Sequence, residues 1–417
     1  MSDSSDLRLS VVSTPLSHAP AFTEILDATA PLLWRRRGAG LVGYGLTARL
    51  EFHGAHRVAQ AASAWNSIVA ASHIDDSVNL PGSGLSAFGS FAFADESSAS
   101  SVLVIPELII GRRDGVAWVT TITKQGATAR AAEVPAIAPL GTPAQVSFVP
   151  GAQSEEGYRE SVREAVRRIQ QGQVSKVVLA RDLVGSIPAE SDIRPMVIDL
   201  AQSYPDCWTY CVDGLIGSSP ETLVRVHDQT MDARVLAGTA ARGVDAHSDL
   251  EAAAELATST KDLDEHAFAV RSVIDSLGPF TTHLSTGESP FTLRLANLWH
   301  LATDVTGSLT PGSTSLDLVA ALHPTAAVAG TPTAEALKLI DELEPFDRGR
   351  YAGAVGWVGS SGDGEWAIAL RCVQIDGERV TAYAGCGVVA NSNADAELNE
   401  TKMKFRPVVD ALSPAVE

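Results

Sequence analysis

Three charged residues near the C-terminus of the chain are spaced to share one face of a helix. Glu397, Glu400 and Lys404 stand at positions i, i+3 and i+7, which places them within about 60° of one another around a helix axis. Two carboxylates beside an amine can hold a hard cation next to an anionic ligand. A solvated Glu/Lys face, which is common on helices, has the same spacing and is favoured on spacing alone.

Lys176 is a second candidate because it stands inside an apolar run, Val174 to Val184, that is typical of a strand. Lysine has a poor propensity for strands. A half-buried amine loses hydration, so its pKa falls and the neutral form can act as a base. A lysine on a solvated edge strand, where it prevents edge-to-edge pairing, fits the same sequence equally well.

Glu221 and Glu265 are candidate acids whose surroundings the sequence leaves open. Glu221 follows Ser219-Pro220 at a break between strands, where a carboxyl group is either an acid with a raised pKa or, more commonly, part of a turn. Glu265 lies on a predicted helix, away from the apolar stripe that contains Leu263 and Val270. Periodicity therefore predicts an exposed Glu265, facing either solvent or a cleft.

Arg371 ends a strand-like run, and Gly385-Cys386-Gly387 follows across a predicted hairpin. A guanidinium group can bind a carboxylate through two hydrogen bonds, and glycines let backbone N–H groups approach a ligand. A strand-end arginine and a glycine bulge are the structural alternatives. His300 and His323, each taken alone, are more often hydrogen-bonded structural histidines than catalysts.

The elements that carry these residues are clearest after a Pro/Ala-rich connector at residues 131–151. Apolar residues recur at helical spacing over 158–169, and a second helix begins at Ser259 and ends at Gly278. Strands are expected at 174–184, 208–212 and 215–226. Strands that alternate with single helices, together with hairpins, indicate an α+β fold.

Composition excludes several classes of protein. The formal net charge is −19 and no basic cluster occurs, so binding to nucleic acid is not expected, because phosphates require a basic face. No apolar run approaches the roughly 18 residues of a membrane span. The Ser-rich residues 1–20 lack the features of a signal peptide and are predicted to be disordered. An acidic protein that takes an anionic substrate needs local cations or a metal.

The four cysteines, Cys207, Cys211, Cys372 and Cys386, have neither metal-ligand spacing nor a disulfide pattern. Reduced thiols and a location in the cytoplasm are therefore expected. No phosphate-binding glycine loop and no nucleophile elbow of serine hydrolases occurs in the sequence.

Taken together, the motifs resemble those of the chorismate-utilising enzymes, and within that family those of the isochorismate synthases closely. The resemblance is dense over residues 154–412 and weak upstream, at Phe88-Gly-Ser-Phe-Ala-Phe93. The matching segments, in the order of the family, are Lys176–Arg181, Gly217–Glu221, Leu236–Thr239, Lys261–His266, Leu298–Thr303, Leu322–Thr325, Gly330–Pro332, Glu342–Asp347, Gly362–Arg371, Ala384–Gly387 and Glu400–Thr401.

The resemblance implies one large α+β domain over residues 21–417, with two antiparallel β-sheets packed face to face, helices outside and the site between the sheets. It also implies an isomerisation of chorismate in which water adds at C2, the C4 hydroxyl leaves and the ring double bonds shift. Members of the family are often monomeric, so a monomer is expected.

The resemblance also implies roles for individual residues. Lys176 would be the general base for water and Glu221 the general acid for the leaving hydroxyl. Mg²⁺ would be bound by Glu265 and Glu400, with Glu397 nearby through water. The substrate would be held by side chains of Arg371 and Lys404 and by backbone groups at Gly238, Thr239, Ala327 and Gly385.

The resemblance also indicates which subfamily of chorismate-utilising enzymes the chain is most similar to. At position 176 the chain resembles the synthases that use water as the nucleophile, because those enzymes carry lysine there. Synthases that use ammonia carry glutamine at this position. A glutamine amidotransferase partner is therefore not expected. Ala237 occupies the place of the nucleophilic lysine of aminodeoxychorismate synthases. Salicylate synthase, which goes on to eliminate pyruvate, is the alternative, although Ala327 stands where those enzymes carry threonine. Siderophore and menaquinone synthesis both begin with isochorismate, and the sequence does not separate them.

Overall fold

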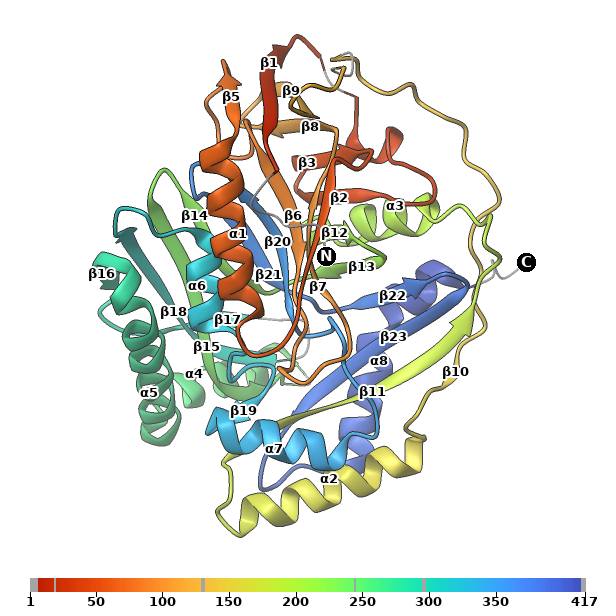
Figure 1. Ribbon diagram of the computed structural model, residues 1–417. Coiled ribbons are helices and arrows are strands. Elements are labelled where there is room, and N and C mark those ends of the chain that lie inside the picture. The colour runs from red at the N-terminus through yellow and green to blue at the C-terminus, as the bar shows by residue number, and fades with distance from the viewer. Residues whose placement is uncertain (1–6, 19, 129–131, 244, 295–297, 414–417) are drawn as a thin grey trace.

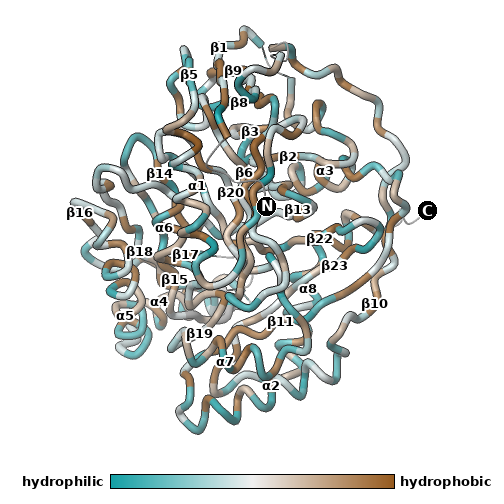
Figure 2. The backbone as a smooth tube through the Cα atoms, in the orientation of Figure 1, coloured by the Kyte–Doolittle hydropathy of each residue, from teal (hydrophilic) through white to brown (hydrophobic). Residues whose placement is uncertain are grey.

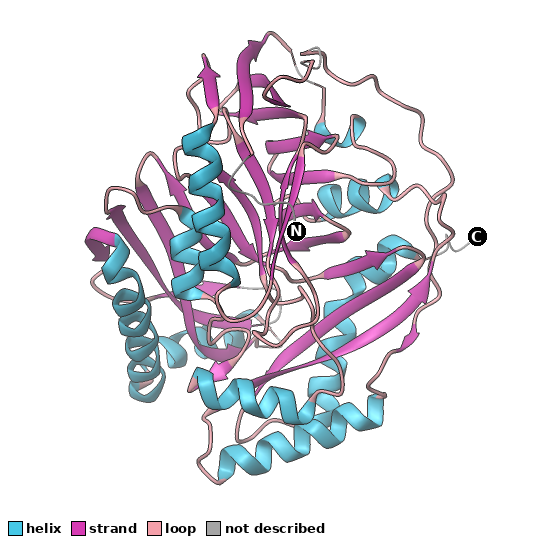
Figure 3. Cartoon of the chain, in the orientation of Figure 1, coloured by secondary structure: helices cyan, strands magenta, loops and turns pink. Residues whose placement is uncertain are grey.

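The structure is a computed structural model that describes residues 7–18, 20–128, 132–243, 245–294 and 298–413. Over these residues the chain forms two large, mostly antiparallel β-sheets with helices on their outer faces (Figure 1, Figure 3). The predicted α+β class, one domain with two antiparallel sheets and outer helices, is confirmed. No described helix is both long enough and apolar enough to cross a membrane.

Within the described residues the first sheet has 13 strands. In spatial order they are β10 (Val149–Pro150), β11 (Lys176–Ser186), β23 (Arg379–Val388), β22 (Cys372–Asp376), β13 (Leu215–Ser219), β12 (Trp208–Val212), β2 (Leu32–Arg36), β3 (Ala39–Tyr44), β8 (Leu108–Arg113), β9 (Val116–Lys124), β1 (Leu9–Leu16) and β5 (His73–Asp76), while β19 (Gly330–Thr331) pairs with β11. All named pairs in this sheet are antiparallel except that of β1 with β5.

The second sheet has 10 strands over the same part of the chain. Their order is β16 (Thr281–Thr286), β18 (Leu298–Leu309), β15 (Thr230–Ala241), β14 (Thr222–His227), β21 (Gly364–Ile368), β20 (Ala354–Gly359), β6 (Ser86–Ser90), β7 (Ser101–Ile105) and β4 (Ala48–Phe52), with β17 (Phe291–Arg294) paired to β18. The Ser219-Pro220 break predicted from the sequence separates β13 in the first sheet from β14 in the second.

Helices cover the outer faces of both sheets. The described helices are α1 (Arg57–Ala71), α2 (Glu155–Gln170), α3 (Arg194–Ser203), α4 (Ala246–Thr258), α5 (Thr260–Leu277), α6 (Ser315–Leu322), α7 (Thr333–Leu343) and α8 (Ala394–Leu412). Helices α2, α3 and α8 pack on the first sheet, and α1, α4, α5 and α6 pack on the second. The helix starts follow local chemistry: Ser154, Ser259 and Asn393 each accept hydrogen bonds from backbone N–H groups of the first turn.

Central strands of the first sheet are buried on both faces, which explains why their sequences are continuous apolar runs. On β2, Trp34 lies in the core between the two sheets and stacks on Trp208, with ring centroids 4.7 Å apart. Its neighbour Leu33 lies in the second core, with Met196 of α3 and Phe405 of α8. Figure 2 shows hydrophobic segments at the centre of the molecule and hydrophilic residues along α2 and α5.

The prediction of a disordered segment over residues 1–20 is wrong for Leu9–Leu16. These residues form β1, which pairs with β5 and β9. Leu9, Val11 and Ser13 alternate with exposed residues and are buried, so the serines of this segment belong to a half-buried strand rather than to a loose tail. Residues 1–6 lie outside the described part of the chain.

Candidate active site

Lys176 is the first residue of β11 and has strand neighbours on both sides. Thr331 of β19 pairs with it on one side, and β23 pairs with β11 from Val177 onward on the other. The lysine is therefore not on a solvated edge strand. Residues Lys176 and Val178 lie on the same face of β11, and that face bears the two glycines of β23, because Gly387 is opposite Val178 and Gly385 is opposite Ala180.

Burial lowers the pKa of Lys176 below the usual value for lysine. The carboxylates of Glu265 and Glu221 oppose this shift, and the ammonium group of Lys404 reinforces it. Burial raises the pKa of Glu221, which directly precedes β14, and the cations Lys176, Arg371 and Lys404 oppose that shift. An amine pushed towards its neutral form thus shares its surroundings with a carboxyl group pushed towards its protonated form.

A β-bulge brings the second sheet into the same region. Gly238 is the extra residue of β15, since Ala237 pairs with Leu301 and Thr239 pairs with His300. Gly238 has φ +78°, a conformation that favours glycine. The His300 Nδ1 atom lies 3.4 Å from the Gly238 carbonyl oxygen, and only the backbone of Thr239 is described.

Burial lowers the pKa of His300, and the charges of Lys176 and Lys404 act in the same direction, while Glu400 opposes them. His300 therefore lies among the candidate residues, although the sequence alone favoured a structural histidine. His323 is such a structural histidine: its Nε2 atom lies 3.0 Å from the Ala352 carbonyl oxygen, and burial lowers its pKa to about 4.

The C-terminal helix α8 presents Glu400 and Lys404 to the end of β23. The Lys404 ammonium donates to the Gly385 carbonyl oxygen at 3.0 Å and lies 2.5 Å from a Glu400 carboxylate oxygen. Strand β22 pairs with β23 only as far as Tyr383. Lys404 thus donates to a carbonyl oxygen, that of Gly385, beyond the end of this strand pairing. Glu400 and Lys404 therefore make specific contacts and do not simply belong to a solvated helix face.

Glu397 lies on α8 beside a different pair of side chains. Its backbone carbonyl is 3.6 Å from the Cys386 sulfur, and Cys386 lies 2.8 Å from the Tyr158 hydroxyl. Cys386 is on the face of β23 opposite to Gly385 and Gly387. The contacts thus place the Glu400 carboxylate next to Lys404, whereas for Glu397 they place only the backbone carbonyl, beside Cys386.

Glu265 is exposed, as periodicity predicts, and its charge acts on Lys176. The neighbouring His266 is buried. Its Nδ1 donates to the Ala237 carbonyl oxygen at 2.9 Å, and its Nε2 accepts from the Thr303 hydroxyl at 2.7 Å. This anchor fixes α5, which carries Glu265, against the bulge of β15.

These residues form one set, which we call the charged cluster: Lys176, Glu221, Glu265, His300, Arg371, Glu400 and Lys404. Among the described residues, no three His, Cys, Asp or Glu side chains are close enough together to hold a metal by themselves. Mg²⁺ keeps several waters and commonly uses one or two carboxylates together with oxygens of the substrate. In the charged cluster, Glu265 and Glu400 supply carboxylates, the kind of ligand that such an ion takes from a protein.

Arg371 precedes β22 and has φ +51°, a left-handed conformation that is uncommon outside glycine. Its carbonyl oxygen accepts from the Ser218 N–H at 3.2 Å, and its guanidinium charge acts on Glu221. Backbone strain of this kind is typical of functional sites. Ala327 lies in the turn between α6 and β19, where the Val328 and Ala329 N–H groups donate to the Thr325 carbonyl oxygen.

A family model described as "Chorismate binding enzyme" matches residues 13–413. The chain belongs to the chorismate-binding enzyme family. Isochorismate synthase DhbC of Bacillus subtilis strain 168 is 39% identical over 269 residues, which are 62% of this chain and 68% of that protein. Putative isochorismate synthase MenF of Mycobacterium tuberculosis strain H37Rv is 40% identical over 255 residues, which are 58% and 68% of the two chains.

The fold also matches a solved structure of this chorismate-binding family. The crystal structure of a putative 2,3-dihydroxybenzoate-specific isochorismate synthase, DhbC from Bacillus anthracis, superposes with a TM-score of 0.71 at 29% identity. The match covers 94% of this chain and 98% of that one. The sequence resemblance to the chorismate-utilising enzymes is therefore confirmed, whereas the roles of individual residues stay predictions.

One buried ion pair of this chorismate-binding chain was not singled out from the sequence. Arg348 and Glu344 contact each other at 2.6 Å with side chains only 2% exposed. Glu344 accepts from the Ala180 N–H at 2.7 Å, and Arg348 donates to the carbonyl oxygens of Val178, at 2.7 Å, and Val328, at 3.0 Å. The pair thus links the strand that carries Lys176 to the turn that carries Ala327.

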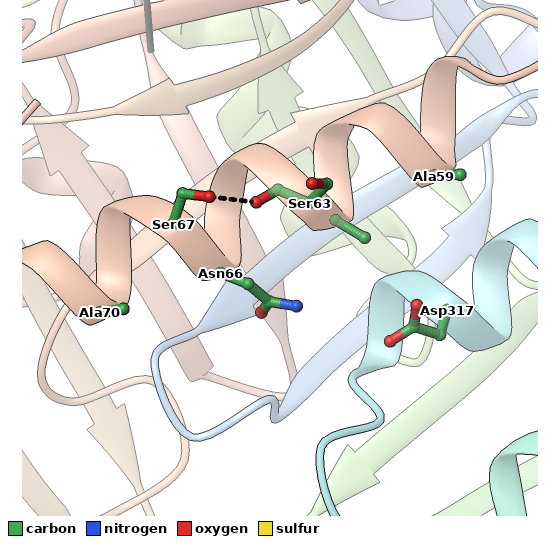
Figure 4. A pocket seen from close by; sticks show the side chains of 7 residues that line it. Ala59, Ser63, Asn66, Ser67, Ala70 and Asp317 are labelled. Carbon is green, nitrogen blue, oxygen red and sulfur yellow. Dashed lines mark hydrogen bonds between the residues drawn. The ribbon is translucent and has the colours of Figure 1, made fainter. Parts of the chain in front are cut away.

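A surface hollow lies away from the charged cluster, between α1 and α6. It is lined by small residues of α1, among them Ala59, Ser63 and Ala70, and by Asp317 of α6 (Figure 4). The Ser67 hydroxyl donates to the Ser63 carbonyl oxygen within α1. The hollow offers a single carboxylate and no cation, so it does not suit an anionic substrate.

Proposed function

We propose that this protein is an isochorismate synthase, an isomerase that converts chorismate to isochorismate. The observation that carries the proposal is the match of the chorismate-binding family model to residues 13–413, in a chain whose charged cluster contains both Lys176 and Glu221. The names of the relatives that are 39% and 40% identical support it. Two cations of the cluster, Arg371 and Lys404, explain how an acidic protein takes a dianionic substrate.

The reaction divides between the two titrating groups. The neutral Lys176 amine takes a proton from water while the water oxygen bonds to C2 of chorismate. The ring double bonds shift, the C4–O bond breaks, and Glu221 gives its proton to the leaving hydroxyl, which departs as water. Burial favours the protonation state that each group needs before the reaction, which is the neutral amine for Lys176 and the protonated carboxyl group for Glu221.

Glu265 and Glu400 would hold Mg²⁺, with Glu397 acting through water, and the bound ion would supply positive charge to a substrate carboxylate. Arg371 and Lys404 bind and orient the carboxylates of chorismate from the first sheet and α8. Backbone groups at Gly238, Thr239, Ala327 and Gly385 complete the proposed contacts with the substrate.

Product analysis tests the proposed activity. Purified protein is incubated with chorismate, with and without Mg²⁺, and the products are separated by chromatography. We expect isochorismate only when Mg²⁺ is present, and we expect it without ammonia, glutamine or an amidotransferase subunit. Salicylate as the main product would support the alternative, pyruvate elimination after isomerisation, and unchanged chorismate would contradict both.

Removal of either proposed metal carboxylate should weaken Mg²⁺ binding. Glu265→Ala and Glu400→Ala are each expected to lower the affinity by at least about 10-fold, since even groups that only orient metal ligands contribute that much. Calorimetric titration of Mg²⁺ alone measures this independently of turnover. Glu160→Ala, at an exposed position of α2, is the control. If Glu265→Ala or Glu400→Ala binds Mg²⁺ as tightly as this control, the substituted residue is not a metal ligand.

The activity should depend on pH in a bell-shaped manner. At low pH Lys176 is protonated and cannot accept a proton, so kcat/KM falls; at high pH Glu221 is ionised and cannot donate one, so kcat/KM falls again. In Glu221→Gln the fall at high pH should disappear, while the lower remaining activity still rises with pH. A Glu221→Gln profile that keeps the alkaline fall would assign that limb to another group.

A further inference from the structure

Gly387 of β23 lies next to the side chain of Lys176. In the antiparallel register Gly387 is opposite Val178, two residues along β11 from Lys176, so the glycine and the lysine are diagonal neighbours on one face of the sheet. A Cβ atom built at Gly387 would be 2.9 Å from Lys176 Cε and 3.7 Å from Lys176 Nζ. Apart from the chain neighbours, no other described atom lies within 4 Å of that position.

The other glycine of this stretch meets different neighbours. A Cβ atom at Gly385 would lie 2.7 Å from the Leu179 carbonyl oxygen and 3.1 Å from Ala180 Cα. The backbone of β11 therefore requires glycine at 385. At 387 nothing in the backbone requires it, because φ lies outside the left-handed region and the only close contact is the end of one flexible side chain.

We propose that Gly387 is a positioning residue whose missing side chain leaves the path along which Lys176 reaches the reacting water. The inference rests on the proposed function, in which Lys176 is the general base. Lys176 lies across the bare Cα atom of Gly387, and a methyl group there would displace the Cε and Nζ atoms. Residue 387 then acts through the lysine and needs no contact with chorismate.

Gly387→Ala tests the proposal, because the added methyl group meets a movable side chain and the fold should be kept. Misplacement of a reacting group by about 1 Å can cost about 10²-fold in rate, so we expect kcat to fall by about that factor. The dissociation constant of chorismate and the melting temperature should stay close to those of the wild type. Gly141→Ala, whose Cβ atom would meet Asp192 at an ordinary 3.4 Å, is the control and should leave all three quantities unchanged.

Gly387→Ala in a Lys176→Ala background distinguishes an effect on the position of Lys176 from a general disturbance of the site. Without the lysine the methyl group meets nothing, so Gly387→Ala should cause no further loss of the residual rate. A wild-type kcat in Gly387→Ala would overturn the inference, and so would an equal loss in both backgrounds. Failure of the wild type to isomerise chorismate, or an active Lys176→Ala, would instead contradict the proposed function.

Discussion

Replacement of Lys176 by alanine should lower kcat by about 10² to 10⁴-fold, the usual contribution of a general base. Lys176 pairs with Thr331 of β19 in a strand that also pairs with β23 from Val177 onward. Burial lowers its pKa, which favours the neutral amine relative to a lysine in water. Binding of chorismate should be largely kept, because Arg371 and Lys404 remain. Steady-state turnover and equilibrium binding, measured on the same preparation, check both expectations.

Two further variants control this prediction. Lys176→Met keeps the aliphatic stem without the amine and should lose activity as Lys176→Ala does. Lys402→Ala removes a half-exposed lysine of α8 that pairs with Glu155 at 2.9 Å, and it should stay fully active. Undiminished turnover in Lys176→Met would refute the assignment of the base.

Arg348→Ala should give the largest loss of stability, about 3 to 5 kcal/mol in the free energy of unfolding, as for a buried pair that loses one partner. The Glu344 carboxylate would remain buried without its cation, and the carbonyl oxygens of Val178 and Val328 would lose their donor. Urea unfolding measures the change.

Matched variants distinguish this pair from ordinary ion pairs. Glu344→Gln keeps an oxygen that can accept from the Ala180 N–H and should cost less than Glu344→Ala. Arg406→Ala removes an exposed pair with Asp410 at 3.4 Å and should cost less than about 1 kcal/mol. An Arg348→Ala variant as stable as Arg406→Ala would show that the buried pair contributes little.

The sequence predicted where helices and strands begin and end better than it predicted which strands pair with one another. The helix that begins at Ser259 and the break at Ser219-Pro220 follow from capping and from proline chemistry, which are local. Pairing of β11 with β19 and β23 depends on residues far along the chain, so the sequence left Lys176 undecided between a buried strand and a solvated edge. In Leu9–Leu16 the buried face includes Ser13 and the exposed face includes Val12, so apolar alternation is weak and the sequence resembles a Ser-rich tail.

The candidate site shows the same limit. Helical spacing identified Glu400 and Lys404 as neighbours, but only the fold shows that Lys404 reaches the Gly385 carbonyl oxygen. Arg348 follows Glu344 at i+4, which is a detectable signal for an ion pair. Its contacts with β11 are separated by 170 residues, so no local pattern indicates them.

Turnover of chorismate in water enriched in the heavy oxygen isotope tests the central claim most directly. If Lys176 activates water for attack at C2 while Glu221 protonates the departing C4 hydroxyl, the isochorismate formed must carry one heavy oxygen atom, in its C2 hydroxyl. Mass spectrometry of the purified product reads this out. Unlabelled isochorismate would contradict the account, because the hydroxyl group would then have moved within the substrate without an attacking water.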